Sequence, residues 1–149
     1  MTIQQVEPGL APVHLLILAD PSVERIRGYL EDGIVFIGER SNTVVAVAVC
    51  KLCDDEFGLY NISVAVSHQG QGLGSQMLMH VFRVAERHGA KFVTVGTGNS
   101  SLRQLSFYQK AGFRISGVIP DYFIGDDPPV FENGIRCIDM IRLRYEPGA

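Results

Sequence analysis

Short apolar runs alternate with amphipathic segments along the chain, a pattern typical of folds that combine strands and helices. Apolar residues recur at helical spacing over 73–85 and stop before Gly89, which predicts one long amphipathic helix. A second helix is expected over 100–111, closed by Gly112. A third is expected from Asp20, its N-cap, with Pro21 at the first helical position, to residue 30. Strands are predicted over 13–18, 34–38, 44–49, 59–66, 92–95, 113–118 and 135–145.

The connections between these elements indicate how the strands pair. The turn at 39–43 joins two strands as a β-hairpin, whereas 59–95 is a strand–helix–strand unit, which favours parallel pairing. Residues 120–133 are rich in Pro and Asp and are expected to form a loop over one edge of the sheet. The sequence therefore predicts an α/β (α+β) fold with a mixed sheet, in a single domain that spans residues 1–149.

Composition narrows the class of partner. Of the 149 residues, 46% are hydrophobic, and 13 Lys and Arg against 16 Asp and Glu give a net charge of -3, so we expect no nucleic-acid partner. The first ten residues lack the basic segment of a secretory signal, and no apolar run approaches the roughly 20 residues that span a bilayer. We therefore expect a cytoplasmic protein that does not associate with membranes.

The three cysteines form no disulfide framework. Cys50 and Cys53 have the spacing of a redox or zinc half-site, but no second Cys/His pair matches it, and the histidines show no metal spacing. We expect ordinary packed thiols and no metal.

The most informative stretch is the glycine turn, residues 69–74 (Gln-Gly-Gln-Gly-Leu-Gly), between a predicted strand and the long helix. Its backbone N–H groups and the helix N-terminus together predict a phosphate site. A dinucleotide fingerprint fails because its third glycine would fall on Ser75, and a Walker A motif fails because no Lys follows. The remaining pattern, [Gln/Arg]-x-x-Gly-x-[Gly/Ala], is satisfied by Gln69, Gly72 and Gly74.

Two motifs in this order resemble the GNAT superfamily of acyl-CoA-dependent N-acetyltransferases. The strand over 62–66 leads into the glycine turn, and residues 105–113 (LSFYQKAGF) are similar to the family's closing motif. The resemblance implies a mostly antiparallel sheet flanked by helices, with strands 4 and 5 splayed apart. It implies acetyl-CoA as co-substrate and direct transfer to a primary amine, expected to be that of a small molecule, in a ternary complex. A CoA-binding domain without catalysis and a protein or peptide N-acetyltransferase remain alternatives, and a homodimer stays open.

By that resemblance, the glycine turn would hold the CoA pyrophosphate. The main chain of the preceding strand would bind the pantetheine arm, and a backbone N–H near Ala65 or Val66 would polarise the thioester carbonyl. Asn99 and Ser101 are further candidate CoA contacts, although Asn99 is also a good helix N-cap. The expected CoA-binding residues are Val64, Ala65, Val66, Gln69, Gly70, Gln71, Gly72, Leu73, Gly74, Ser75, Asn99 and Ser101.

The candidate catalytic residues are Tyr108 and Glu56. Tyr108, the tyrosine of the closing motif, is the expected general acid for the leaving thiolate, with packing beside Leu105 as the alternative. Many relatives place a glutamate where this chain has Gly58, so Glu56 is the candidate base. Its competitors are Asp121, Asp139 and a chain of waters. The acidic loop residues 54–56, 121 and 126–127 are either attractors of a cationic amine or simply solvated.

Overall fold

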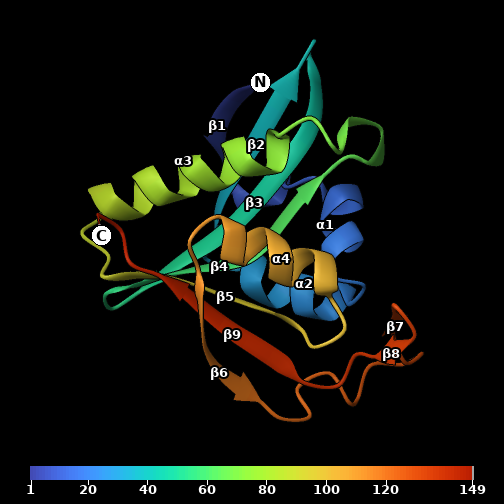
Figure 1. The fold of residues 1–149 in the computed structure, drawn as a ribbon. Helices are drawn as coiled ribbons and strands as arrows, with labels where there is room; N and C mark the ends of the chain where they lie inside the picture. Colours follow the sequence, from blue (N-terminus) through green and yellow to red (C-terminus); the bar gives the residue numbers. More distant parts are fainter. Residues whose placement is uncertain (149) are drawn as a thin grey trace.

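The computed structural model describes residues 1–148, which form a seven-stranded sheet and a separate two-stranded hairpin (Figure 1). The sheet order is β1-β2-β3-β4-β5-β9-β6, in which β4 and β5 pair in parallel and the other neighbours are antiparallel. The strands are β1 (Thr2–Val6), β2 (Ile34–Arg40), β3 (Thr43–Cys53), β4 (Glu56–Val64), β5 (Phe92–Gly98), β6 (Arg114–Ile119), β7 (Phe131–Glu132), β8 (Ile135–Arg136) and β9 (Met140–Tyr145). The helices are α1 (Val13–Ala19), α2 (Val23–Leu30), α3 (Leu73–Arg87) and α4 (Leu102–Lys110), with short 3₁₀ turns η1 (Pro8–Leu10) and η2 (Val66–His68). This architecture confirms the mixed, mostly antiparallel sheet flanked by helices.

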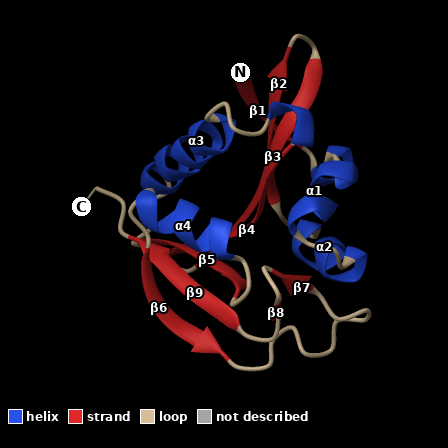
Figure 2. Ribbon diagram, turned by 45° about the vertical axis from the view of Figure 1, so that its right-hand side comes forward, coloured by secondary structure: helices blue, strands red, loops and turns tan. Residues whose placement is uncertain are grey.

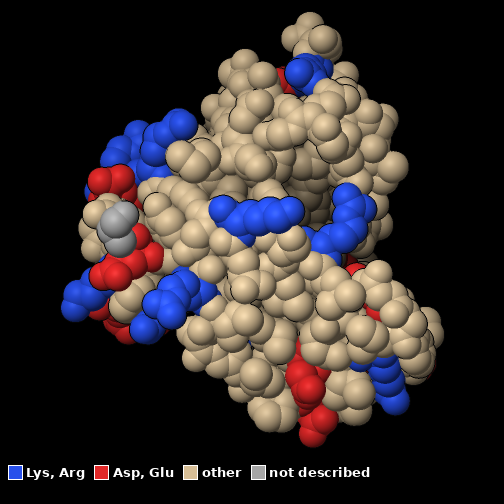
Figure 3. All heavy atoms as spheres, in the orientation of Figure 1, with Lys and Arg blue, Asp and Glu red and all other residues tan. Residues whose placement is uncertain are grey.

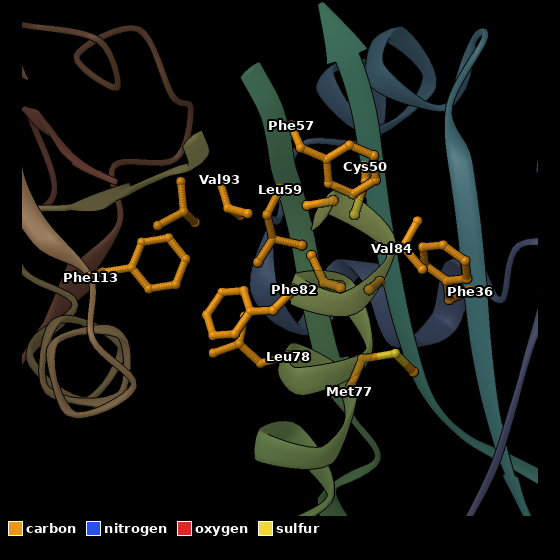
Figure 4. Packing of buried hydrophobic residues seen from close by; sticks show 14 of the residues in the cluster. Phe36, Cys50, Phe57, Leu59, Met77, Leu78, Phe82, Val84, Val93 and Phe113 are labelled. Atoms are coloured by element: carbon orange, nitrogen blue, oxygen red, sulfur yellow. The ribbon is translucent and has the colours of Figure 1, made fainter. Parts of the chain in front are cut away.

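Helices cover both faces of the sheet, with α3 and α4 on one side and α1 and α2 on the other (Figure 2). The long helix α3 lies where the apolar periodicity predicts it. Met77, Leu78 and Val81 on its inner face are almost fully buried and pack against Phe57 and Leu59 of β4 (Figure 4). Burying each such side chain contributes about 1.5–3 kcal/mol, so this contact anchors the helix that follows the glycine turn.

The predicted hairpin is confirmed, with a tighter turn than expected. Ser41 and Asn42 connect β2 to β3, and both have left-handed φ, 52° and 62°. Two consecutive left-handed residues match the twist of the flanking strands, and Asn adopts this conformation at low cost. The predicted parallel strand–helix–strand unit is also confirmed, because β4 pairs with β5 across α3.

The prediction of a strand over 13–18 is wrong, because these residues form α1. Leu15 and Leu16 are buried while Val13, Ile17 and Leu18 are exposed, so the apolar run has a one-sided, helical distribution. A short apolar run cannot be assigned to strand or helix by periodicity alone. The edge strand β1 was not predicted, since its sequence TIQQV has only a weak apolar pattern.

Two predicted boundaries also change. Helix α2 is capped by Ser22, whose hydroxyl accepts the Arg25 N–H at 3.1 Å, so Asp20 is not its N-cap and Pro21 precedes it. The predicted strand 135–145 is interrupted between β8 and β9.

Packed thiols are confirmed for Cys50 and Cys137, which are buried, but Cys53 is exposed. Burial raises the pKa of the Cys50 thiol.

A bulge in β4 is the irregularity with the largest consequence. Leu59 lies opposite Cys50 and Asn61 opposite Val49, so Tyr60 has no partner in β3. An inserted residue reverses which face the following side chains point to. Phe57 and Leu59 therefore pack toward α3, whereas Asn61 bonds to the other layer, its Nδ2 donating to the Leu16 carbonyl of α1 at 3.0 Å.

Among residues 1–148, none of the helices combines the length and the apolar character that crossing a bilayer requires.

Candidate functional site

The glycine turn presents a row of free backbone donors at the start of α3. Gly70 and Gly72 have φ of 77° and 79°, and the left-handed Gly72 is the N-cap of α3. The first backbone N–H after Gln69 that makes a hydrogen bond to the main chain is that of Gln76, which donates to Gly72 O at 3.1 Å. Within residues 1–148 no acceptor takes the N–H groups of residues 70–75. Free donors in a left-handed turn at a helix N-terminus fit a phosphate group.

Two glutamines brace this turn from either side. The side chain of Gln69 reaches back to β4, where its Nε2 donates to the Val64 carbonyl at 3.0 Å. On the other side, Arg40 at the end of β2 donates through Nη1 to Gln71 Oε1. Figure 3 shows Lys and Arg side chains beside a hollow between α4 and the glycine turn, so the surroundings favour an anion.

Strands β4 and β5 part immediately beyond their paired residues, as the predicted splay requires. Their register runs from Glu56 opposite Phe92 to Leu59 opposite Val95, although β4 continues to Val64 and β5 to Gly98. The gap between the separated ends leads toward the glycine turn. An extended ligand can lie there and bond to the unpaired edge of β4.

The hydrogen-bond pattern shows which main-chain groups face the gap. The Ala65 N–H donates to Val45 O of β3 at 2.8 Å. Because alternate residues of an antiparallel strand point the same way, Ile62 and Val64 direct their N–H and C=O groups into the gap. The predicted contact through the Ala65 N–H is therefore wrong, since β3 takes that donor. The sequence analysis did not name Ile62, although strand alternation from Val64 places its main chain at the same edge.

Tyr108 lies on the inner face of α4, where its ring packs edge-on to Phe113 at 5.4 Å between centroids. Burial raises the pKa of Tyr108, so the phenol stays protonated at neutral pH. Its hydroxyl has no hydrogen-bond partner among residues 1–148, where no polar side-chain atom is both fully buried and unpartnered. The hydroxyl is thus an unpartnered donor within the described chain, on a side chain that is 5% exposed and does not line the cavity described below.

The carboxylates considered as bases lie elsewhere. Glu56 is exposed at the start of β4, opposite Phe92, and does not line the cavity described below. Asp139 is used structurally, since its Oδ1 accepts the Asp121 N–H at 2.9 Å. Neither Asp121 nor Asp139 lines the cavity.

Asn99 holds a loop rather than a helix. Its Oδ1 accepts the N–H groups of Ile138 and Asp139 at 2.8 and 3.0 Å, and its Nδ2 donates to Arg136 O at 3.1 Å. The N-cap of α4 is instead Ser101, so the predicted capping role of Asn99 is wrong. The Ser101 hydroxyl donates to Glu132 Oε1 at 2.8 Å. Both side chains thus shape the segment that leads into β9.

A cavity of about 350 Å³ opens where β4 and β5 separate, on the side of the sheet that α1 and α2 cover. Its floor is formed by residues 58–60 of β4, residues 94 and 96–98 of β5, and residues 140 and 142 of β9. Its walls come from the α1–α2 junction and the segment between β6 and β8, which includes the predicted loop. Of the acidic loop residues in the prediction, Asp126 lines it, while Asp55 pairs with Lys91 at 3.4 Å outside it.

A polar network fixes the wall of this cavity. Asn61 donates to the Tyr29 hydroxyl at 2.9 Å, and that hydroxyl donates to Asp20 Oδ2 at 3.2 Å. Arg25 then bridges Asp20 at 2.9 Å and Asp126 at 3.1 Å, which ties α2 to the loop over the cavity. Burial alone would lower the pKa of Arg25, but its bonds to the two carboxylates raise it overall. The network joins residues 20–29 to Asn61 of β4 and Asp126 of the loop, and the sequence did not indicate that these three segments meet.

Known proteins share this arrangement. The model of the acetyltransferase (GNAT) family matches residues 10–113. An uncharacterized N-acetyltransferase of Bacillus subtilis, YvbK, is 41% identical over 131 residues, covering 87% of this chain and 84% of that protein.

Two solved structures superpose along almost the whole chain. An IAA acetyltransferase from Bacillus cereus has a TM-score of 0.92 at 39% identity, covering 97% of this chain and 98% of the other. A GNAT acetyltransferase from Elizabethkingia anophelis with acetyl-CoA bound has a TM-score of 0.92 at 40% identity, covering 97% of each chain. With the splayed strands and the free donors of the glycine turn, these matches identify the chain as a member of the GNAT family of acetyltransferases.

Proposed function

We propose that this enzyme transfers the acetyl group of acetyl-CoA to the primary amine of a small molecule, directly and within a ternary complex. The observation that carries the proposal is the position of the cavity. It begins where β4 and β5 part, so a donor lying in the gap would end at the cavity mouth. Its volume of about 350 Å³ is at the small end of the range for small-molecule pockets.

The donor-binding residues follow from the direction of the gap. The free N–H groups of the glycine turn would hold the pyrophosphate, and Ile62 and Val64 would bond the pantetheine amides through their main chain. Gln69 occupies the Val64 carbonyl with its side chain and would have to share or release it. Asn99 and Ser101 would act indirectly, by shaping the loop beside the gap.

The same geometry favours a different oxyanion contact from the one expected near Ala65 or Val66. The acetyl end must reach the cavity near Tyr60, whereas Val66 lies at the phosphate end of β4. Of the residues whose N–H groups face the gap, Ile62 is the nearer to the cavity. We therefore assign to its N–H the polarisation of the thioester carbonyl.

Acetyl-CoA supplies the acetyl group as a thioester with a thiolate leaving group. The neutral amine forms the new C–N bond as the C–S bond breaks. Tyr108 gives its proton to the leaving sulfur, and the proton lost by the amine restores the phenol through solvent. Because Glu56, Asp121 and Asp139 lie outside the cavity, the amine would enter neutral or lose its first proton to water. Holding both substrates in line would provide much of the acceleration.

A protein acceptor is the second candidate. The ribosomal protein bS18-alanine N-acetyltransferase of Escherichia coli, whose name specifies such an acceptor, is 26% identical over 84 residues, or 56% of this chain. The bridge from Arg25 to Asp126 argues against it, since it ties the loop down over the cavity.

Thiol release with a panel of small amines and of peptides carrying free N-termini separates these functions. We expect amine-dependent release with small amines, with the acetylated product confirmed by mass. Turnover on peptides alone would favour the protein acceptor, and tight acetyl-CoA binding without turnover on any amine would indicate a non-catalytic CoA-binding domain.

A further inference from the structure

The cavity contains two charged side chains that the described chain does not neutralise. Arg142 of β9 is half-buried on the cavity floor, and no carboxylate of residues 1–148 forms an ion pair with it. Within residues 1–148, the hydrogen bond of its side chain is a long contact of Nη1 with Met140 Sδ at 4.0 Å. Glu132 of β7 lines the same cavity and has no cationic partner there.

One carboxylate oxygen of Glu132 is held by hydrogen bonds, and the other is available to a ligand. Its Oε1 accepts the hydroxyls of Ser100 and Ser101 at 3.0 and 2.8 Å. Within residues 1–148 no donor bonds to Oε2. The carboxylate is thus oriented by two neutral donors and keeps one acceptor oxygen for a ligand.

The other charges of the cavity are already satisfied. Arg25 bonds to both Asp20 and Asp126, so its guanidinium is committed to the wall. Arg142 is the remaining cation among the cavity residues and Glu132 the remaining anion. A charge in a partly desolvated cavity without a partner is costly, and a ligand of opposite charge offsets that cost.

The strand register and the hydrogen bonds of Glu132 bring the two charges to the same end of β5. Arg142 lies opposite Gly96 of β5, and Met140 opposite Gly98. Glu132 is tethered just beyond Gly98, at Ser100 and Ser101. Both charged side chains therefore line the cavity near the same end of β5, where one small ligand could contact both.

We propose that the acceptor carries a carboxylate beside its amine, as an amino acid does, with Arg142 binding the carboxylate and Glu132 accepting an N–H of the amine. The planar guanidinium suits a carboxylate because it can donate two parallel hydrogen bonds. The proposal rests on the proposed function, since it names the substrate class of that acceptor cavity.

Amino acids and their primary amides provide the test, because each pair shares the amine and the side chain and differs in the carboxylate. We measure kcat/KM by thiol release for the acid and the amide of each pair. In the Arg142→Gln variant the acid-to-amide ratio should fall about 10- to 100-fold relative to wild type, the loss of a charge-assisted bidentate contact. Each amide differs from its acid in the basicity of the amine. Because the same pairs are used for every variant, this difference cancels when the acid-to-amide ratio of a variant is compared with that of wild type.

Arg144→Gln is the matched control. Arg144 lies on the same strand, two residues away and with the same charge, but it does not line the cavity, and its guanidinium stacks on Phe92 at 4.5 Å. Its ratio should equal that of wild type. Arg142→Lys keeps the positive charge but lacks the two parallel donors of the guanidinium, so it should give an intermediate acid-to-amide ratio. Glu132→Gln should raise KM for acid and amide alike, with the ratio unchanged.

The outcomes separate the two levels of the proposal. Acetylation of amines with the same acid-to-amide ratio in wild type and Arg142→Gln would overturn the carboxylate assignment and leave the proposed function intact. Bound acetyl-CoA with no amino acid, amide or simple amine acetylated would overturn both.

Discussion

A glutamate at position 72 should abolish acetyl-CoA binding without unfolding the protein. Gly72 is the left-handed N-cap of α3, and a Cβ added there meets no atom within 4 Å, so a side chain has room to project from the turn. A carboxylate placed about 5 Å from one phosphate charge repels it by about 3 kcal/mol at an effective dielectric constant near 20. The dissociation constant for acetyl-CoA should therefore rise by about 100-fold or more.

The same substitution has a small effect on folding. A non-glycine residue in the left-handed region costs about 1–2 kcal/mol, whereas an acidic side chain at a helix N-terminus contributes about 0.3–1 kcal/mol of stability. The net loss of about 1 kcal/mol is small against the 5–15 kcal/mol typical of folded domains. Loss of binding in Gly72→Glu would therefore report on the phosphate site and not on unfolding.

Two alanine variants separate charge from backbone strain. Gly72→Ala introduces the strain without the charge and should bind acetyl-CoA far better than Gly72→Glu. Gly74→Ala is the matched control, because its Cβ would meet Phe107 ring carbons at 3.6 and 3.7 Å, an ordinary contact, and alanine favours the helix by about 0.8–1 kcal/mol. Calorimetric titration with acetyl-CoA and thermal unfolding of all three variants measure both effects. If Gly72→Glu binds as tightly as Gly72→Ala, no phosphate lies at this turn.

Three further predictions concern the acid, the loop and the pH dependence. Tyr108→Phe should lower kcat by about 10²–10⁴-fold with acetyl-CoA affinity unchanged, and wild-type turnover would reduce Tyr108 to a packing role. Asn99→Ala removes three hydrogen bonds that hold the loop before β9 and should lower the free energy of unfolding by about 1–3 kcal/mol in denaturant titrations; an unchanged midpoint would contradict this. Burial and two nearby arginines lower the pKa of His80. The unfolded chain therefore binds its proton first as pH falls through about 6.5, and stability should decline on the acid side. In His80→Gln the midpoint temperature of thermal unfolding should fall less between pH 7 and pH 5 than in wild type. An unchanged pH dependence would mean that other groups cause the loss of stability in acid.

The parts of the fold that were predictable are those encoded locally. Helix α3 and the glycine turn were found because an apolar period and three glycines lie within one continuous segment. The helix α1 was mistaken for a strand because a short apolar run carries no periodicity that distinguishes the two. The role of Asn99 was missed because its partners, residues 136–139, lie nearly forty positions away.

More of the donor side of the site than of the acceptor side could therefore be predicted from the sequence. The residues expected to bind CoA follow one another along β4 and into α3, so a motif could identify them. The cavity is assembled from the α1–α2 junction, β4, β5, β9 and the segment between β6 and β8, and its charged residues show no spacing that a pattern could detect. Only the tertiary structure brings Arg142 and Glu132 into one cavity.

The bulge at Tyr60 explains why the two halves of the site meet. Without it, β4 and β5 could remain paired from end to end, and no gap would open for a donor. The inserted residue shifts the face of β4 by one position, while the parallel strand β5 has no matching insertion, so the pairing cannot continue past Leu59 and Val95. Beyond the bulge, Ile62 and Val64 face the gap with their main chain, whereas Asn61 supports the cavity wall through Tyr29. One inserted residue thus opens the donor gap and aligns the acceptor wall at the same point of the sheet, where acetyl transfer would have to occur.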